Sequence, residues 1–212
     1  GNGFDLAHGI KTSFNHFISD YFCKAISSFF ENGLYSDTLL EIKHRQVSGY
    51  YDPKPEPVTT ENIYEIANKL LKSRYVDFNF KSILLNKVYS KTSVLRWVDI
   101  EVEFFNVLVS TKRVYSREKV EGAVEQVNEQ LEYLKVELIE YLTEQQNKFN
   151  NTSIKSPLAN CFREEIKKDE IVTVNLEEDK LPDNLYFLNF NYTKTFEDYF
   201  KICQRHIPSS YN

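Results

Sequence analysis

The predicted fold rests on two segments, GNGFDLAHG at residues 1–9 and LYFLNFNYT at residues 185–193. The first has the glycine spacing of a turn between a strand and a helix, where glycine lets the backbone approach a phosphate closely. The second is typical of a short buried strand with polar residues at its carboxyl end, where open α/β sheets bind ligands. Because they stand at opposite ends of the sequence, the two segments predict one nucleotide site split by a long insertion.

Helical periodicity fills most of the sequence between these segments. Apolar residues recur every three to four positions, which predicts helices over about 14–32, 60–70, 78–89, 93–109, 117–149 and 157–167. We expect Thr12 or Ser13 to cap the first helix and Asn32-Gly33 to end it. Thr59 or Thr60 is the expected N-cap of the second. Short strands are expected near 171–174 and 186–190.

The order of these elements predicts an α/β fold. We expect a Rossmann-like parallel sheet core formed by residues 1–33 and 155–212, interrupted by a large all-helical insertion over residues 34–154. The glycine turn of such a core follows a strand, and we therefore expect a strand before Gly1.

The stretch 117–149 is the longest predicted helix, and its apolar positions form a heptad seam. The spacing alternates between four and three residues through Val120, Val124, Val127, Leu131, Leu134, Leu138 and Tyr141. Such a seam can pack within one chain as an antiparallel helical hairpin. We favour this packing within one chain, because one face of any bundle helix has such a pattern, and a homo-oligomer contact is the alternative.

Composition indicates a folded protein without the features of a strong nucleic-acid binder. Apolar residues make up 42% of the sequence, whereas the net charge is −5 and no basic stripe is present. No apolar run is long enough to span a membrane. Cys23, Cys161 and Cys203 lack CxxC or zinc spacing, so we expect free thiols, no bound metal and a cytoplasmic location.

The N-terminal segment supplies the first group of candidate site residues. The backbone of Gly1, Asn2 and Gly3 is expected to hold a phosphate. Asp5 is expected either to cap the turn or to bind a ribose hydroxyl. His8 is either a site residue or a structural hydrogen-bonding group. These residues, with Phe4 beside them, form one half of the expected nucleotide site.

The C-terminal segment supplies the second group. Side chains alternate along a strand, so Asn189 and Asn191 are expected on one face, with Tyr192 beside them. Their side-chain amides could orient a ligand hydroxyl or a water molecule. The alternative is that the asparagine side chains form hydrogen bonds with the neighbouring backbone in an Asx-type turn. Thr193 is the expected N-cap of a final helix.

A third candidate lies in WVDIE at residues 97–101. On a continuous helix, Glu101 would align with Trp97 and Phe105 in an apolar stripe. A buried carboxylate there could act as a catalytic acid or base. The alternative is a buried ion pair that anchors the insertion.

These segments make the sequence resemble the AbiH family of bacteriophage abortive-infection proteins. The resemblance rests on GNGFDLAHGIKTSF at residues 1–14, WVDIE at 97–101 and FLNFNYTKTFE at 187–197. It implies a role in phage defence, with a phage component as one expected partner. The terminal motifs are also distantly similar to those of sirtuin-like NAD-binding domains. In those domains a glycine-rich turn is followed much later by a T-x-N-x-D segment and a His-Gly pair.

The sirtuin-like similarity implies NAD, or a related nucleotide, as substrate or ligand. Asn191 matches the asparagine of the second motif and would position the ribose or a water for hydrolysis. Thr193 replaces the aspartate of that motif, and no His-Gly follows, since His206 precedes Ile207. A non-catalytic nucleotide sensor therefore stands as an alternative. A nuclease using Asp5, Asp99 and Glu101 as Mg²⁺ ligands is a further one.

Overall fold

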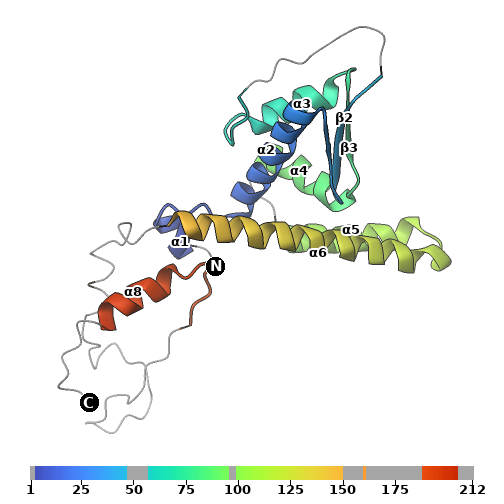
Figure 1. Cartoon of the computed structure of the whole chain (residues 1–212). Helices are drawn as coiled ribbons and strands as arrows, with labels where there is room; N and C mark the ends of the chain where they lie inside the picture. Colours follow the sequence, from blue (N-terminus) through green and yellow to red (C-terminus); the bar gives the residue numbers. More distant parts are fainter. Residues whose placement is uncertain (1–2, 47–56, 96–98, 150–159, 161–187, 205–212) are drawn as a thin grey trace. The chain divides into compact units, whose positions relative to one another are not determined.

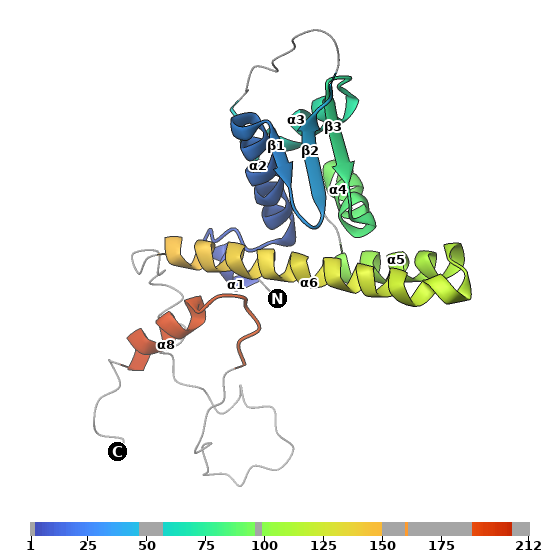
Figure 2. The ribbon, with the colours of Figure 1, turned by 45° about the vertical axis from the view of Figure 1, so that its right-hand side comes forward.

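The computed structural model describes residues 3–46, 57–95, 99–149, 160 and 188–204, which group into two compact units. One unit draws on residues 1–12 and 142–212, and the other comprises residues 13–141. We call them the terminal unit and the central unit. Figures 1 and 2 show the elements of each.

Helix α2 (Phe14–Asn32) is the main apolar element of the central unit. The hydroxyl of Ser13 accepts a hydrogen bond from the His16 N–H at 3.2 Å, which caps the first turn. Gly33 ends the helix with a left-handed φ of 75°, and its N–H donates to the Phe29 carbonyl. The predicted start and end of this helix are confirmed. Its buried face includes Phe17, Ile18, Tyr21, Phe22, Ala25, Ile26 and Phe29.

The sheet of the central unit has three antiparallel strands in the order β1 (Leu34–Ser36), β2 (Leu40–His44) and β3 (Val76–Phe80). Leu40 and Ile42 are fully buried, whereas Glu41 and Lys43 pair with each other at 2.7 Å on the other face. This alternation is expected for a sheet with one face on the core and one in solvent. Helix α2 contacts β1 and β2, so its apolar side covers the inner face (Figure 2).

Two further helices complete the core around the sheet. Helix α3 (Ile63–Lys72) buries Ile63, Ile66 and Leu70, and contacts both α2 and β3. Helix α4 (Ile83–Leu95) buries Leu84, Leu85 and Val88 against its neighbours. Aromatic rings join the elements, since the centroids of Phe22, Phe80 and Tyr89 lie 5.1 to 6.3 Å apart.

Helices α5 (Ile100–Val114) and α6 (Arg117–Lys148) run side by side (Figures 1 and 2). Along α6, Val127, Leu134 and Tyr141 are buried at a spacing of seven residues, and Tyr141 stacks on Phe17 at 5.7 Å. Part of the predicted heptad seam is therefore used inside the chain. An additional contact through this helix between copies of the chain stays a prediction.

The terminal unit contains the short helix α1 (Gly3–Ala7), the last residues of α6 and helix α8 (Thr195–Gln204). The backbone after α1 turns sharply at Gly9, which has a φ of 77°. Thr12 and Ile10 are buried here, as are Asp5 and Tyr199.

The predicted parallel, Rossmann-like sheet is wrong. The described residues are mostly helical, and their strands form one small antiparallel sheet within residues 34–80. Strands β1 and β2 are joined by three residues, which suits an antiparallel pair, because parallel strands need a long crossover. The same strands also overturn the all-helical character predicted for residues 34–154. Residues 188–190, expected in a strand, have no regular secondary structure.

Three helix starts also differ from expectation. Helix α4 starts at Ile83 rather than near residue 78, because residues up to Phe80 belong to β3. The N-cap of α3 is Asn62 rather than Thr59 or Thr60. Helix α5 starts only at Ile100, because the Asp99 side chain accepts hydrogen bonds from the N–H groups of Glu101 and Val102 and so caps it there. The helix and strand expected over 157–174 lie outside the described residues, apart from Asn160. The predicted domain boundaries stay a prediction.

Membrane-spanning segments are absent from the helices that the structure describes, since none is both long and apolar enough to cross a bilayer.

Gly33 and Gly122 offer a matched test of the fold. Gly33→Ala is expected to lower the free energy of unfolding by about 1 kcal/mol, because an L-residue at φ 75° is strained. Gly122 lies inside α6 with no atom near its missing Cβ. Gly122→Ala is expected to raise the free energy of unfolding by about 0.5–1 kcal/mol. Urea denaturation measures both, and the same sign for the two variants would contradict the described helix end.

Candidate functional site

A buried chain of hydrogen bonds joins the N-terminal and C-terminal motifs in the terminal unit. The Thr193 hydroxyl donates to Asp5 Oδ1 at 2.5 Å, and its oxygen lies 2.6 Å from the Thr195 hydroxyl. Since Thr193 donates its proton to Asp5, Thr195 is the donor between the two threonines. All three residues are at most 6% exposed. The two sequence motifs expected to form one site therefore do meet.

The second carboxylate oxygen of Asp5 defines the chemistry of this cluster. Asp5 is fully buried, yet its Oδ2 has no hydrogen-bond partner in the described part of the chain. A buried carboxylate oxygen without a donor costs free energy, whereas a charge-assisted hydrogen bond there is strong. The site therefore presents an acceptor that suits a hydroxyl or N–H donor.

His8 lies beside this chain in a defined tautomer. Its Nδ1 lies 2.7 Å from the Phe4 carbonyl oxygen, which can only accept, so Nδ1 carries a proton. In the neutral imidazole, Nε2 then accepts a hydrogen bond from the Tyr199 hydroxyl at 2.5 Å. Both ring nitrogens are engaged within the fold. We therefore assign His8 a structural role in binding Tyr199, the second of the two roles that the sequence left open.

Aromatic rings enclose the same residues. The Phe4 ring packs edge-on against Tyr199 at 5.5 Å and against Phe196 at 6.1 Å. Phe149, just after α6, contacts the His8 ring at 6.3 Å. The polar chain thus lies in a low-polarity environment, which strengthens each hydrogen bond and raises the cost of any unfilled one. We call Phe4, Asp5, His8, Thr193, Thr195 and Tyr199 the terminal-motif cluster.

The asparagines of the C-terminal motif lie outside this buried chain. Asn189 Oδ1 accepts hydrogen bonds from the backbone N–H and the side-chain amide of Asn191, at 3.0 and 2.9 Å. This is the Asx-type turn that the sequence left as an alternative to ligand binding. Tyr192 is 61% exposed.

Gly3 begins helix α1, and Gly1 and Asn2 lie outside the described residues.

The buried carboxylate of α5 is Glu103 rather than Glu101. Glu103 is 3% exposed and pairs with Lys91 of α4, whereas Glu101 is an exposed residue that lines a pocket. The burial predicted for Glu101 is wrong, because the predicted helix began at residue 93 and α5 begins at Ile100. Because Asp99 caps α5, the helix begins after Trp97, and the predicted apolar stripe of Trp97, Glu101 and Phe105 does not form.

A second polar cluster, in the central unit, is built around Asp37 in the β1–β2 turn. Its carboxylate accepts hydrogen bonds from the hydroxyls of Tyr21 and Tyr35 and from the N–H groups of Leu39 and Leu40. Burial, followed by the charge of Asp37, raises the pKa of Tyr21 far above its usual value. Both carboxylate oxygens have donors, so this cluster stabilises the hairpin and leaves no acceptor for a ligand.

Cys23 is a free thiol, in line with the sequence prediction for that residue. It is half-buried, and burial is the main cause that raises its thiol pKa to about 11. A thiol with so high a pKa is a poor nucleophile at neutral pH, so Cys23 does not qualify as a catalytic group. The other two cysteine side chains fall outside the part of the structure that can be described.

Comparison with known proteins identifies the family. The model of the family described as "Bacteriophage abortive infection AbiH" matches residues 1–209. The chain therefore belongs to the AbiH family, which confirms the resemblance drawn from its motifs. No curated protein and no solved structure matches significantly. The similarity to sirtuin-like domains finds no support in these comparisons.

Thr193 tests the buried link between the two motifs. Thr193→Val removes the donor to Asp5 and is expected to lower the free energy of unfolding by about 2 kcal/mol. Thr193→Ser keeps the hydroxyl and should cost about half as much or less. Chemical denaturation followed by circular dichroism measures both. Equal losses for the two variants would show that the hydroxyl contributes nothing.

Lys91 tests the buried ion pair between α4 and α5. Lys91→Met leaves the Glu103 carboxylate unpaired and is expected to cost about 2–3 kcal/mol. Lys43→Met is the matched control, because the Lys43 side chain is as exposed as that of Lys91, whereas its partner Glu41 is 24% exposed and Glu103 only 4%. That control should leave the free energy of unfolding almost unchanged, because a solvent-screened surface pair contributes little.

The pair Lys91→Met with Glu103→Gln separates charge from packing. The double variant is expected to recover at least half of the loss, since no charge then remains buried. A double variant as unstable as Lys91→Met alone would mean that packing, not the unpaired carboxylate, causes the loss. Urea denaturation gives all of these values.

Proposed function

We propose that this AbiH-family chain acts in abortive infection of bacteriophage-infected bacteria by binding a ribonucleotide at the terminal-motif cluster. One observation carries the proposal: Asp5 Oδ2 is a buried acceptor without a donor among the described residues. A ribose hydroxyl has the chemistry to fill it. Family membership supports the phage-defence role.

The cluster restricts which part of a nucleotide could lie beside Asp5. Thr193 already donates to Oδ1, so Oδ2 is the carboxylate oxygen without a donor among the described residues. A carboxylate repels a phosphate and attracts a hydroxyl or amine donor. The phosphate would therefore bind away from Asp5, and the neighbouring glycines of the N-terminal motif are the candidates that the sequence offers.

The geometry favours binding over hydrolysis. A general base needs a free lone pair aimed at a substrate, and His8 Nε2 already accepts from Tyr199. Asn191, the residue expected to position a water, bonds to Asn189 in a turn. The proposed role is accordingly that of a nucleotide-binding sensor. Cleavage of NAD would require these groups to rearrange.

Calorimetric titration of the purified protein tests the ribose contact. We expect ATP or NAD to bind, and Asp5→Asn to weaken binding about tenfold through loss of a charge-assisted hydrogen bond. Asp198→Asn, a change of the same chemistry at an exposed ion pair on α8, is the matched control and should bind normally. Circular dichroism verifies that each variant is folded.

A thermodynamic cycle with 2′-deoxy and 3′-deoxy nucleotides identifies the hydroxyl. The deoxy analogue that lacks the bonded hydroxyl should lose affinity for the parent protein but not for Asp5→Asn. If the affinity losses caused by the deoxy analogue and by Asp5→Asn are additive, the missing hydroxyl does not contact Asp5. If no nucleotide binds, the proposal is overturned, and a structural water would be the expected hydrogen-bond donor to Asp5 Oδ2.

Phage challenge connects the site to defence. Bacteria expressing the parent protein or Asp198→Asn should reduce plaque formation, and those expressing Asp5→Asn should not. Nicotinamide in the infected cells is measured in parallel. If nicotinamide is released and the release requires Asp5, the protein is an NAD-cleaving enzyme rather than a sensor. If folded Asp5→Asn protects the bacteria fully, neither role depends on this site and both proposals are contradicted.

A further inference from the structure

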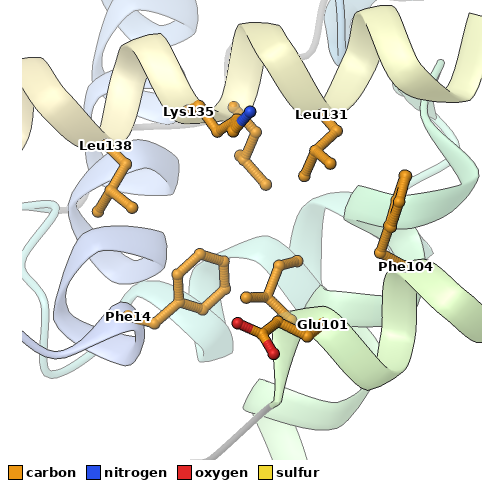
Figure 3. A pocket seen from close by; sticks show the side chains of 8 residues that line it. Phe14, Glu101, Phe104, Leu131, Lys135 and Leu138 are labelled. Atoms are coloured by element: carbon orange, nitrogen blue, oxygen red, sulfur yellow. The ribbon is translucent and has the colours of Figure 1, made fainter. Parts of the chain in front are cut away.

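We propose that the central unit has a second binding site, for a small apolar molecule that carries a positive charge. The site is a pocket of about 290 Å³ whose residues come from the start of α2, the first turns of α5 and the middle of α6. Figure 3 shows Phe14 and Glu101 on one side, with Leu131, Lys135 and Leu138 of α6 on the other.

The walls of the pocket are apolar apart from two charged residues. They are formed by Phe14, Ile100, Glu101, Phe104, Leu131, Leu134, Lys135 and Leu138. Ligand pockets for small molecules start near 300 Å³ and combine an apolar lining with a few polar groups. The volume therefore suits a single one- or two-ring compound.

The pocket exists because α6 uses only part of its apolar face for packing. Leu134 is 3% exposed and its neighbours at seven-residue spacing, Val127 and Tyr141, are equally buried. Leu131 and Leu138, on the adjoining edge of the helix, are only half-buried and border the pocket. A ligand there would cover apolar surface that the helices themselves leave open.

Charge decides the class of ligand. Lys135 pairs with Glu132 at 2.6 Å, so its ammonium already has a counter-ion. The Glu101 carboxylate has no ion pair or side-chain hydrogen bond among the described residues, and it lies beside the ring of Phe14 (Figure 3). Its uncompensated negative charge next to apolar walls selects an ammonium or other cationic group on an apolar body.

This site is separate from the one proposed for a nucleotide. All of its lining residues belong to the central unit, and none is part of the terminal-motif cluster. It also gives Glu101 a role as a ligand anchor in place of the catalytic one expected from the sequence.

Three indole probes that differ in charge test the proposal by calorimetry on the purified protein. Tryptamine is cationic at neutral pH, tryptophol is neutral and indole-3-propionate is anionic. For a molecule of this size we expect roughly millimolar or tighter binding of tryptamine. Tryptophol should bind about tenfold more weakly, and indole-3-propionate should not bind measurably.

Two variants place the binding at this pocket. Glu101→Gln should weaken tryptamine binding about tenfold and leave tryptophol unchanged. Glu129→Gln is the matched control, since helical spacing puts it on the opposite side of α6 from the pocket, in solvent. Leu138→Trp should fill the half-buried wall position and abolish binding of both probes.

Three results would overturn the proposal. One is a lack of tryptamine binding to the folded protein. Another is equal affinity for all three probes, because charge would then select nothing. The third is unchanged binding in Glu101→Gln or Leu138→Trp, which would place the probe elsewhere.

Discussion

The buried hydrogen bond between Thr193 and Asp5 is the interaction on which the terminal unit depends. It joins residues 188 positions apart in the sequence and connects the two motifs that characterise the chain. A carboxylate that is fully buried must receive donors, so the helix that carries Asp5 and the loop that carries Thr193 cannot be repositioned independently. The contact of His8 with Tyr199 and the packing of Phe4 reinforce the same arrangement.

The central unit depends on a different constraint, the continuous apolar face of α2. Residues from Phe17 to Phe29 on that face are almost completely excluded from solvent. One amphipathic helix of nineteen residues can cover a three-stranded sheet and still contact a second helix. The strands are only three to five residues long, and packing of α2 and α3 against the sheet contributes to its stability.

The sequence predicted the elements that local chemistry determines. Ser13 and Gly33 fix the ends of α2 through a cap and a left-handed residue, and both signals are visible without a structure. Strand β2 was not predicted, although Leu40, Glu41, Ile42 and Lys43 alternate between apolar and polar residues, because residues 34–154 were interpreted as all-helical. The parallel sheet was inferred from a short glycine pattern and from the predicted order of strands and helices, which together do not specify a fold.

The sequence can suggest which polar residues belong to a site, but it does not show which residues they contact in the folded protein. The sequence placed Asp5 in a turn, whereas the structure places it in helix α1, and no local signal could show that Thr193 would bond to it from the other end of the sequence. Glu101 was selected for a buried role that belongs to Glu103, two positions along the helix. The difference arises from one capping residue, Asp99, because the start of a helix sets which side chains face the core.

Two carboxylates in this protein show how the surroundings of one functional group determine what it can bind. Asp5 is enclosed, with one oxygen bonded and one open, so a single aligned donor such as a hydroxyl satisfies it. Glu101 borders an apolar pocket that is partly open to solvent, so its charge can be compensated by a mobile cation with an apolar body. The two proposed sites are therefore expected to differ in their ligands although both rely on a carboxylate.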